Sequence, residues 1–468
     1  MPETIASVIP EILETSEEDD GVRTTSSSQG SDPKGPEGAQ AGRQPVSTLK
    51  AYVNLVTVLI GAGIMALPQL PVRGGWVLSP LILLMVMLTT AESALQMWKA
   101  FMASRASQHG KFEMSTYEDL GREAWGPVGQ MLAALVVNTF LFGVYSAYAV
   151  LVGMQLANLA QALDKQLWIL IMYPVFIALA LLPDLSALSK FVPLGMVAAC
   201  ATAVCIICKS LLDASRWGSW DLADGEELHS PWPQEPAALG VVLATCIGAM
   251  TFHPVVPAVI QDMKTPEQFP LAMTGAVVTC GSLYMAVIVC GYYGYGNFIQ
   301  GDVVQSMAYS PASFREAVTV PGQDWTGDAA LWVLPVAAVL VLINIILSMP
   351  LLAMAMFYSI QDFKHFAPYV KPGSWANWAL RVALVTLAVT IALCVPQFTL
   401  VFGFFCAVCG PAASLVFPVL FSGAVLRRSG KRPSWPRVGL HSFIMVLSVF
   451  CMVAGIYSSV LDLLGASA

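Results

Sequence analysis

Two stretches of the sequence determine its architecture: NLVTVLIGAGIMALP, Asn54 to Pro68, and GVVLATCIGAMTFHPVVPAVIQDMK, Gly240 to Lys264. Both are apolar, and both are interrupted near the middle. The first contains the run Gly61-Ala62-Gly63, and the second contains Gly248 followed by two prolines. Glycine costs about 1 kcal/mol inside a helix, and proline removes a backbone donor. The sequence therefore predicts two helices that unwind at mid-length.

The position of these two stretches indicates an inverted repeat. The first opens a group of five apolar segments, and the second opens the next five. A matched pair of interrupted segments in two halves points to the binding site of an inverted-repeat transporter. Unwound backbone is tolerated in a membrane only where it faces protein or a watery cavity. The alternative is that the glycines only allow close helix packing.

The composition is that of a polytopic α-helical membrane protein. Of 468 residues, 56% are hydrophobic and 11% are charged, whereas soluble domains carry about 25% charged residues. A spanning helix needs about 20 mostly apolar residues. Eleven segments are expected to span the membrane: 50–70, 76–98, 128–160, 166–183, 188–210, 237–260, 269–296, 330–360, 375–395, 398–425 and 438–464.

The distribution of Lys and Arg predicts the orientation. With eleven spans and a cytoplasmic N-terminus, 18 of the 23 Lys and Arg residues fall on the cytoplasmic side, as the positive-inside rule requires. The C-terminus is then extracellular or lumenal. The rule fixes only the cytoplasmic side, so the plasma membrane and the vacuole or lysosome both fit.

Residues 1–47 form an acidic leader, with nine acidic residues against three basic ones. This segment is rich in Ser, Gly and Pro and poor in aromatic residues, so we expect it to be a disordered cytoplasmic tail. The alternative is a sorting or regulatory segment that binds cytoplasmic partners. Residues 48–468 are almost neutral and are expected to form one transmembrane transporter domain. No basic surface for nucleic acid is visible.

Four stretches resemble the amino acid/auxin permease family, and together they run from about residue 50 to 464. They are Asn54 with Gly61-Ala62-Gly63, Leu67 and Pro68; TYEDLGREAWGPVG, Thr116 to Gly129; FHPVVPAVIQDMKTPEQFPLAM, Phe252 to Met273; and FGFFCAVCGPAASLVFPVLF, Phe402 to Phe421. The resemblance implies an all-α, leucine-transporter-like fold with a 5+5 inverted repeat plus one helix. It implies transport of amino acids, driven by a proton gradient or, in some branches, a sodium gradient, with no other cofactor.

The expected substrate site follows from the two interruptions. Half-helix N-termini attract a carboxylate, and freed carbonyls hold an ammonium group. The residues expected to bind substrate at the interruptions are Ile60, Gly61, Ala62, Gly63, Gly248, Ala249 and Met250. Asn138 and Tyr145 lie seven residues apart, hence on one helical face, and are expected to line the same cavity. Many members of the family have Gly where this chain has Phe252, so a narrower site is expected.

His253 is the first candidate for the coupling ion. It lies deep in an apolar segment, where an ionisable group is expensive and is by default a functional candidate. Its ordinary pKa of about 6.5 suits proton coupling. The alternative is a neutral histidine that bonds to freed backbone beside Pro254.

Three polar residues are candidates for a sodium site. By resemblance to related folds, Asn54, Asn344 and Ser348 would supply the oxygen ligands that hard cations prefer. The alternative is hydrogen bonding between helices, worth about 0.6 kcal/mol per bond.

Three charged residues and a cysteine pair complete the predictions. Asp262 and Lys264 end the second interrupted segment and are expected to form a gate ion pair. Arg381 lies about six residues into its segment and is expected to snorkel to the interface. Cys406 and Cys409 have redox-motif spacing but lie in an apolar segment, so we interpret them as helix packing.

Other classes of function are less well supported. The sequence contains no phosphate-binding glycine loop, metal-ligand cluster or nucleophile elbow, so we do not expect an enzyme. A channel would favour rings of charge or a filter, and neither is visible. A transporter-like nutrient sensor that binds an amino acid with little flux stays open, because a long tail can plug a cavity or dock a partner.

Overall fold

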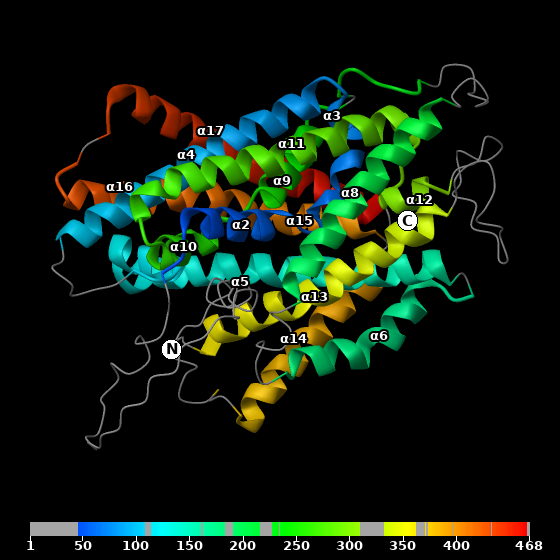
Figure 1. The fold of residues 1–468 in the computed structure, drawn as a ribbon, viewed down its shortest axis with the longest axis horizontal. Helices are drawn as coiled ribbons and strands as arrows, with labels where there is room; N and C mark the ends of the chain where they lie inside the picture. Colours follow the sequence, from blue (N-terminus) through cyan, green and yellow to red (C-terminus); the bar gives the residue numbers. More distant parts are fainter. Residues whose placement is uncertain are drawn as a thin grey trace, which may run out of the picture.

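The apolar runs fold into long helices that lie alongside one another (Figure 1). The computed structural model describes residues 45–107, 114–160, 162–182, 191–215, 227–233, 235–308, 332–361, 370, 373–395, 397–431 and 433–465. The long α-helices are α4 (Leu78–Ser107), α5 (Tyr117–Leu159), α6 (Lys165–Ala180), α8 (Val192–Ala214), α11 (Phe269–Tyr295), α13 (Val333–Gln361), α14 (Trp375–Cys394) and α17 (Trp435–Gly465).

Shorter elements complete the described chain. The first interrupted span comprises α2 (Thr48–Leu59), η2 (Ala62–Met65), η3 (Leu67–Gln69) and α3 (Leu70–Gly74), and the second comprises α9 (Ala238–Ala249), η5 (His253–Val255) and α10 (Val256–Asp262). Around α11 lie η6 (Pro266–Gln268), η7 (Gly296–Phe298) and α12 (Val303–Ser306), and the tenth span comprises α15 (Phe398–Pro411), the π-helix η8 (Ala412–Val416) and α16 (Phe417–Arg428).

Both predicted interruptions are confirmed. Helix α2 ends at Leu59, and the chain is extended at Gly61, with φ −137° and ψ −168°. It then resumes at an angle of 50° to α2. Helix α9 ends at Ala249, and a short non-helical stretch separates it from η5 and α10. The two breaks lie against each other, because a Cβ placed on Gly63 would lie 3.3 Å from Ala249 Cβ.

The expected count of eleven spans is not confirmed. Within the described residues, nine helices are long and apolar enough to cross a membrane, and the bent pair at the first interruption makes ten. The remaining expected span, 166–183, coincides with α6, which is apolar but has 16 residues and contains Pro174. It is therefore shorter than the roughly 20 residues that a bilayer requires.

The helix ends gather in two groups (Figure 1). We call the inner end the one that carries the starts of α2 and α5 and the ends of α10 and α16; α3 and α12 lie at the outer end (Figure 1). At the inner end, the Arg428 guanidinium donates to the carbonyl of Glu123. At the outer end, Arg73 forms an ion pair with Asp462. Which compartment each end faces stays a prediction, with the cytoplasm expected at the inner end.

The described chain begins with a contact at the inner end. Residues 1–44 of the expected tail lie outside the described residues. The Val46 amide donates to the Asp262 carbonyl at 2.8 Å, and the Lys264 amide donates to the Val46 carbonyl at 2.9 Å. The two gate candidates therefore hold the chain just before α2 through their backbone groups. The ion pair between their side chains stays a prediction.

The expectation that Arg381 snorkels to the interface is wrong. Arg381 is 6% exposed and packs over the Phe357 ring, 5.0 Å from its centroid. Its guanidinium donates to the carbonyls of Ala180 and Leu182, at 3.0 and 3.1 Å, and to Asn377 Oδ1. The carbonyls at the end of α6 have no further helical donor, so they offer this buried cation a better environment than the interface.

Candidate functional site

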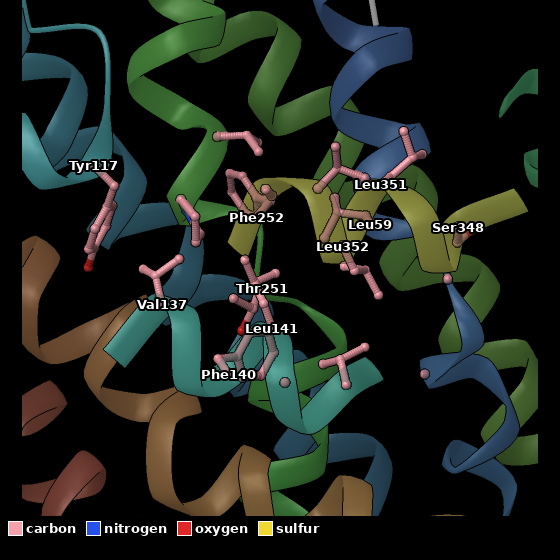
Figure 2. Close-up of a pocket in the computed structure, with 18 of the residues that line it drawn as sticks. Leu59, Tyr117, Val137, Phe140, Leu141, Thr251, Phe252, Ser348, Leu351 and Leu352 are labelled. Atoms are coloured by element: carbon pink, nitrogen blue, oxygen red, sulfur yellow. The ribbon is translucent and has the colours of Figure 1, made fainter. Parts of the chain in front are cut away.

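The two breaks, α5 and α13 enclose a cavity of about 320 Å³ (Figure 2). Figure 2 shows side chains from all four sources around it: Leu59, Thr251 and Phe252 from the breaks, Val137, Phe140 and Leu141 from α5, and Ser348, Leu351 and Leu352 from α13. The cavity lies at the place that the interrupted sequence predicts.

Most of the residues expected to bind substrate at the breaks do line this cavity. They are Ile60, Gly61, Gly63, Gly248 and Ala249. Met250 does not line it and is fully buried in the protein. The side chain of Ala62 lies outside the described residues.

The expected face of α5 is wrong. Neither Asn138 nor Tyr145 lines the cavity; the wall is formed instead by Ala134, Val137, Phe140, Leu141, Val144 and Tyr148. The Asn138 amide donates to Ser359 Oγ at 2.7 Å. Tyr145 is buried, with 3% of its surface exposed. On α5, the tyrosine that reaches the first break is Tyr148, because a Cβ on Gly61 would lie 3.3 Å from its hydroxyl oxygen.

The part of the cavity at the breaks carries no charged side chain among the described residues. Phe252, Phe402 and Tyr148 supply aromatic rings there, and Thr251 supplies a hydroxyl. The charged residues of the described lining are Glu118 and Asp119, at the start of α5. The surroundings of the breaks thus suit a small ligand whose charges are met by backbone groups.

His253 lies behind the cavity wall. It is fully buried and does not line the cavity. Its Nε2 lies 3.1 Å from the Thr90 carbonyl oxygen and 2.7 Å from Ser93 Oγ. A carbonyl oxygen only accepts, so Nε2 carries the hydrogen. Nδ1 is buried without a hydrogen-bond partner in the described chain, which fits a neutral ring. His253 bonds to the backbone of α4 rather than to freed backbone in its own break.

The π-helix η8, a widened turn between α15 and α16, contacts the residues around His253. Pro418 has no backbone N–H, so the preceding turn loses a helical donor. The Tyr117 hydroxyl donates to the Ala413 carbonyl at 2.6 Å, and the Ser93 hydroxyl donates to the Ser414 carbonyl at 2.7 Å. The Ser414 hydroxyl in turn bonds to Thr251 at 2.7 Å. Helices α4 and α5 are thereby tied to the π-helix η8 and to the second break.

The sodium candidates are only partly brought together. Asn344 and Ser348 both line the cavity, and the Ser348 hydroxyl lies 3.5 Å from Asn344 Oδ1. Asn54 is buried outside the lining, and its Oδ1 has no hydrogen-bond partner in the described chain. Two oxygen-bearing side chains therefore lie on the wall, and the third does not.

The described residues contain no group of three or more His, Cys, Asp or Glu residues that could hold a metal ion. Cys406 and Cys409 are buried free thiols. Cys406 packs closely on the second break, because a Cβ on Gly248 would lie 2.0 Å from its Sγ. This contact agrees with the interpretation of the pair as helix packing.

At the outer end, α5 is joined to the segment before α12 through a buried carboxylate. Asp302 has no exposed surface. It accepts hydrogen bonds from Gln155 Nε2 at 2.6 Å, Asn158 Nδ2 at 3.1 Å and the Val304 amide at 3.0 Å. Burial raises the pKa of Asp302 to about 6, although these donors partly offset the effect. At the outer end, the described helices are thus joined by one buried carboxylate, Asp302, and its neutral hydrogen-bond donors. The pKa of this carboxyl lies close to neutral pH.

Asp302→Asn is expected to change how stability depends on pH. The folded-state pKa of about 6 lies above the ordinary value of 3.8, so the folded protein binds the extra proton between these values. The contribution of Asp302 to stability falls as pH rises from about 4 to above 6, by roughly 3 kcal/mol. The apparent Tm of Asp302→Asn relative to the parent should rise by on the order of 3 °C between pH 4.5 and pH 7.5. A Tm difference that is the same at both pH values would contradict this.

A helical membrane protein with two broken spans around a central cavity has a leucine-transporter-like fold. A solved structure described as "Inward facing conformation of Mhp1" is similar to this chain in fold. It matches with a TM-score of 0.55 and 10% sequence identity, covering 91% of this chain and 92% of that one. At this identity the match shows the fold alone.

The family is shown by sequence. The model of the family described as "Transmembrane amino acid transporter protein" matches residues 44–461. The amino acid transporter AVT1D of Arabidopsis thaliana is 23% identical over 427 residues, which is 88% of this chain and 69% of that protein. The amino acid transporter AVT1I of the same plant is 24% identical over 439 residues, 90% of this chain and 96% of that protein. The chain belongs to this family of transmembrane amino acid transporters.

Proposed function

We propose that this protein carries neutral amino acids across a membrane by alternating access, with the substrate held between the two broken spans. The observation that carries the proposal is the cavity, which is lined by Gly61 and Gly63 of one break and by Gly248 and Ala249 of the other. The relatives are named as amino acid transporters, which supports the class of substrate.

The backbone at the breaks suits a zwitterion. The N-terminal amides of η2 form the positive end of a short turn, and the last carbonyls of α9 form the negative end of a helix. The substrate carboxylate would bind at the first and the ammonium group at the second. Because no charged side chain of the described chain lies at the breaks, neutral side chains are favoured.

The energy source is proposed to be a proton gradient, with sodium as the alternative. Asn344 and Ser348 on the cavity wall keep the sodium alternative open. The N-terminus is proposed to be cytoplasmic and the C-terminus extracellular or lumenal, in the plasma membrane or the vacuole or lysosome. The acidic N-terminal tail is proposed to bind cytoplasmic partners.

The deciding experiment is uptake of a radiolabelled amino-acid panel into proteoliposomes, first under an imposed pH gradient and then under a sodium gradient. Accumulation of alanine under the pH gradient, well above protein-free liposomes, is the expected result. Accumulation under sodium alone would overturn proton coupling. Saturable binding without accumulation under either gradient would overturn the carrier and favour the sensor.

Phe252 is expected to limit the size of the substrate. It lines the cavity and is 1% exposed, packed against the His253 ring at 4.8 Å between centroids. Phe252→Ala removes most of that ring volume from the wall. Uptake of phenylalanine relative to alanine should then rise by about 10-fold, the range that pocket size controls. An unchanged ratio in a folded variant would show that Phe252 does not set specificity.

A further inference from the structure

We call the inner mouth the part of the cavity that is lined by the start of α5, Thr116 to Asp119. It carries one carboxylate, Glu118, that has no ion-pair partner among the described residues. Glu118 lies in the first turn of α5 and lines the cavity. It accepts a hydrogen bond from Ser359 Oγ on α13 at 3.2 Å, and Thr116 also donates to it. None of the ion pairs among the described residues includes Glu118. A carboxylate in this setting is stable either protonated or beside water.

The neighbouring acidic residue, Asp119, caps the start of α5. Asp119 Oδ2 accepts from the Ser115 and Thr116 amides, which completes the capping box of α5. Its other oxygen pairs with Arg122 at 3.5 Å. Asp119 therefore serves as the cap of α5, whereas Glu118 receives only neutral donors.

Ser359 links Glu118 to a second buried polar group. The Asn138 amide donates to Ser359 Oγ, so the Ser359 hydroxyl hydrogen points to the Glu118 carboxylate. Asn138 Oδ1 is buried without a hydrogen-bond partner in the described chain. The chain Asn138–Ser359–Glu118 thus orients one donor toward the ionised form of Glu118.

This polar chain is separate from the breaks. Tyr148 contacts the first break, and Asn138 lies ten residues earlier on α5, which corresponds to about 15 Å along the helix. Glu118 therefore lies in the inner mouth, below the place proposed for the substrate. The other titratable groups of the described chain that line this mouth are Tyr117 and Asp119 on α5 and Tyr358 on α13. His253 lies behind the cavity wall and does not line it.

We propose that Glu118 is the proton-binding residue that couples pH to the opening of the inner mouth. This rests on the proposed alternating-access function. When the mouth is open, water reaches the carboxylate and favours the ionised form. When α5, α13 and the breaks close on it, water leaves and the neutral acid is favoured. The proton comes from, and returns to, water in the cavity, and its uptake accompanies closure by reciprocal linkage.

The test compares Glu118→Gln with Glu123→Gln in proteoliposomes, using labelled alanine. Gln imitates the protonated acid, and Glu123 lies on the same helix outside the cavity lining. Each variant is first matched to the parent by size-exclusion elution. Glu118→Gln should retain alanine exchange at equal pH within about 3-fold and lose pH-driven accumulation by at least about 10-fold. Glu123→Gln should keep both activities.

Three results overturn the proposal. The first is pH-driven accumulation by Glu118→Gln at the parental level. The second is loss of exchange together with accumulation in a folded Glu118→Gln. The third is a weaker affinity for cationic amino acids with an unchanged pH profile, which would make Glu118 a substrate ligand. Failure of the parent itself to transport would instead refute the proposed function.

Ser359→Ala provides a second, milder variant. It removes the donor that stabilises ionised Glu118 and leaves the carboxylate in place. The pH of half-maximal uptake should therefore move to higher pH, while the maximal exchange rate stays within about 2-fold. A profile that does not move in Ser359→Ala would contradict the role of Glu118 as the titrating group.

Discussion

Gly63→Leu is expected to abolish transport, with a loss of at least about 100-fold. Gly63 lines the cavity where the two broken spans meet. A Cβ at this position would lie 3.3 Å from Ala249 Cβ and 3.6 Å from Phe402 Cζ. Three further carbons would extend into the space proposed for the substrate or push the breaks apart. Either displacement moves the backbone groups that are proposed to hold the zwitterion.

The measurement is alanine exchange in proteoliposomes, with protein amounts matched after size-exclusion chromatography. Gly423→Leu is the matched control: Gly423 lies in α16, and a Cβ there meets no atom within 4 Å. It should transport normally. Gly63→Ala should retain part of the activity, because a shift of a few tenths of an ångström accommodates one methyl group. Full exchange by Gly63→Leu would show that the substrate does not pass between the breaks.

The sequence predicts the breaks well because their cause is local. A helix cannot continue through Gly61-Ala62-Gly63 or through the prolines after Gly248 without a cost that the chain itself imposes. Five of the residues expected at those interruptions therefore line the cavity, whereas Met250 is buried in the protein. The same reasoning identifies the long helices, because apolar runs of 20 or more residues have few other stable conformations in a membrane.

The walls of the cavity could not be predicted in the same way. Helices α5 and α13 are apolar on almost every face, so periodicity does not say which face meets the cavity. Asn138 and Tyr145 were expected there as polar groups on one face, yet the cavity meets the face of Val137, Val144 and Tyr148. Tertiary packing, rather than local sequence, decides the rotation of such a helix.

Glu118 is a residue of the cavity wall that the sequence alone does not identify. It lies inside TYEDLGREAWGPVG, next to the capping residues Thr116 and Asp119. In sequence it looks like another acidic residue in a helix's first turn. Only the approach of Ser359, 241 positions later, places it on a cavity wall. Contacts at such separations depend on the whole fold and have no short-range signal.

Arg381→Ala is expected to cause the largest loss of stability among the substitutions considered. The buried guanidinium is shared by the carbonyls of Ala180 and Leu182 and by Asn377. Its removal leaves two acceptors at the end of α6 without this donor, each costing about 1–3 kcal/mol, or roughly 2–6 kcal/mol together. The apparent Tm should fall by on the order of 5 °C, or the variant should elute as aggregate.

Two further variants separate this anchoring role from the effect of charge. Arg381→Lys keeps the charge but lacks the planar fork that reaches three acceptors, so it should recover less than half of the lost Tm. Arg437→Ala removes an exposed arginine from α17 and should leave the Tm within about 1 °C, as for other surface sites. An arginine that snorkelled to the interface would tolerate alanine as Arg437 does. A normal Tm for Arg381→Ala would therefore refute the anchor and restore the interfacial interpretation, because no buried carbonyl would then depend on this side chain.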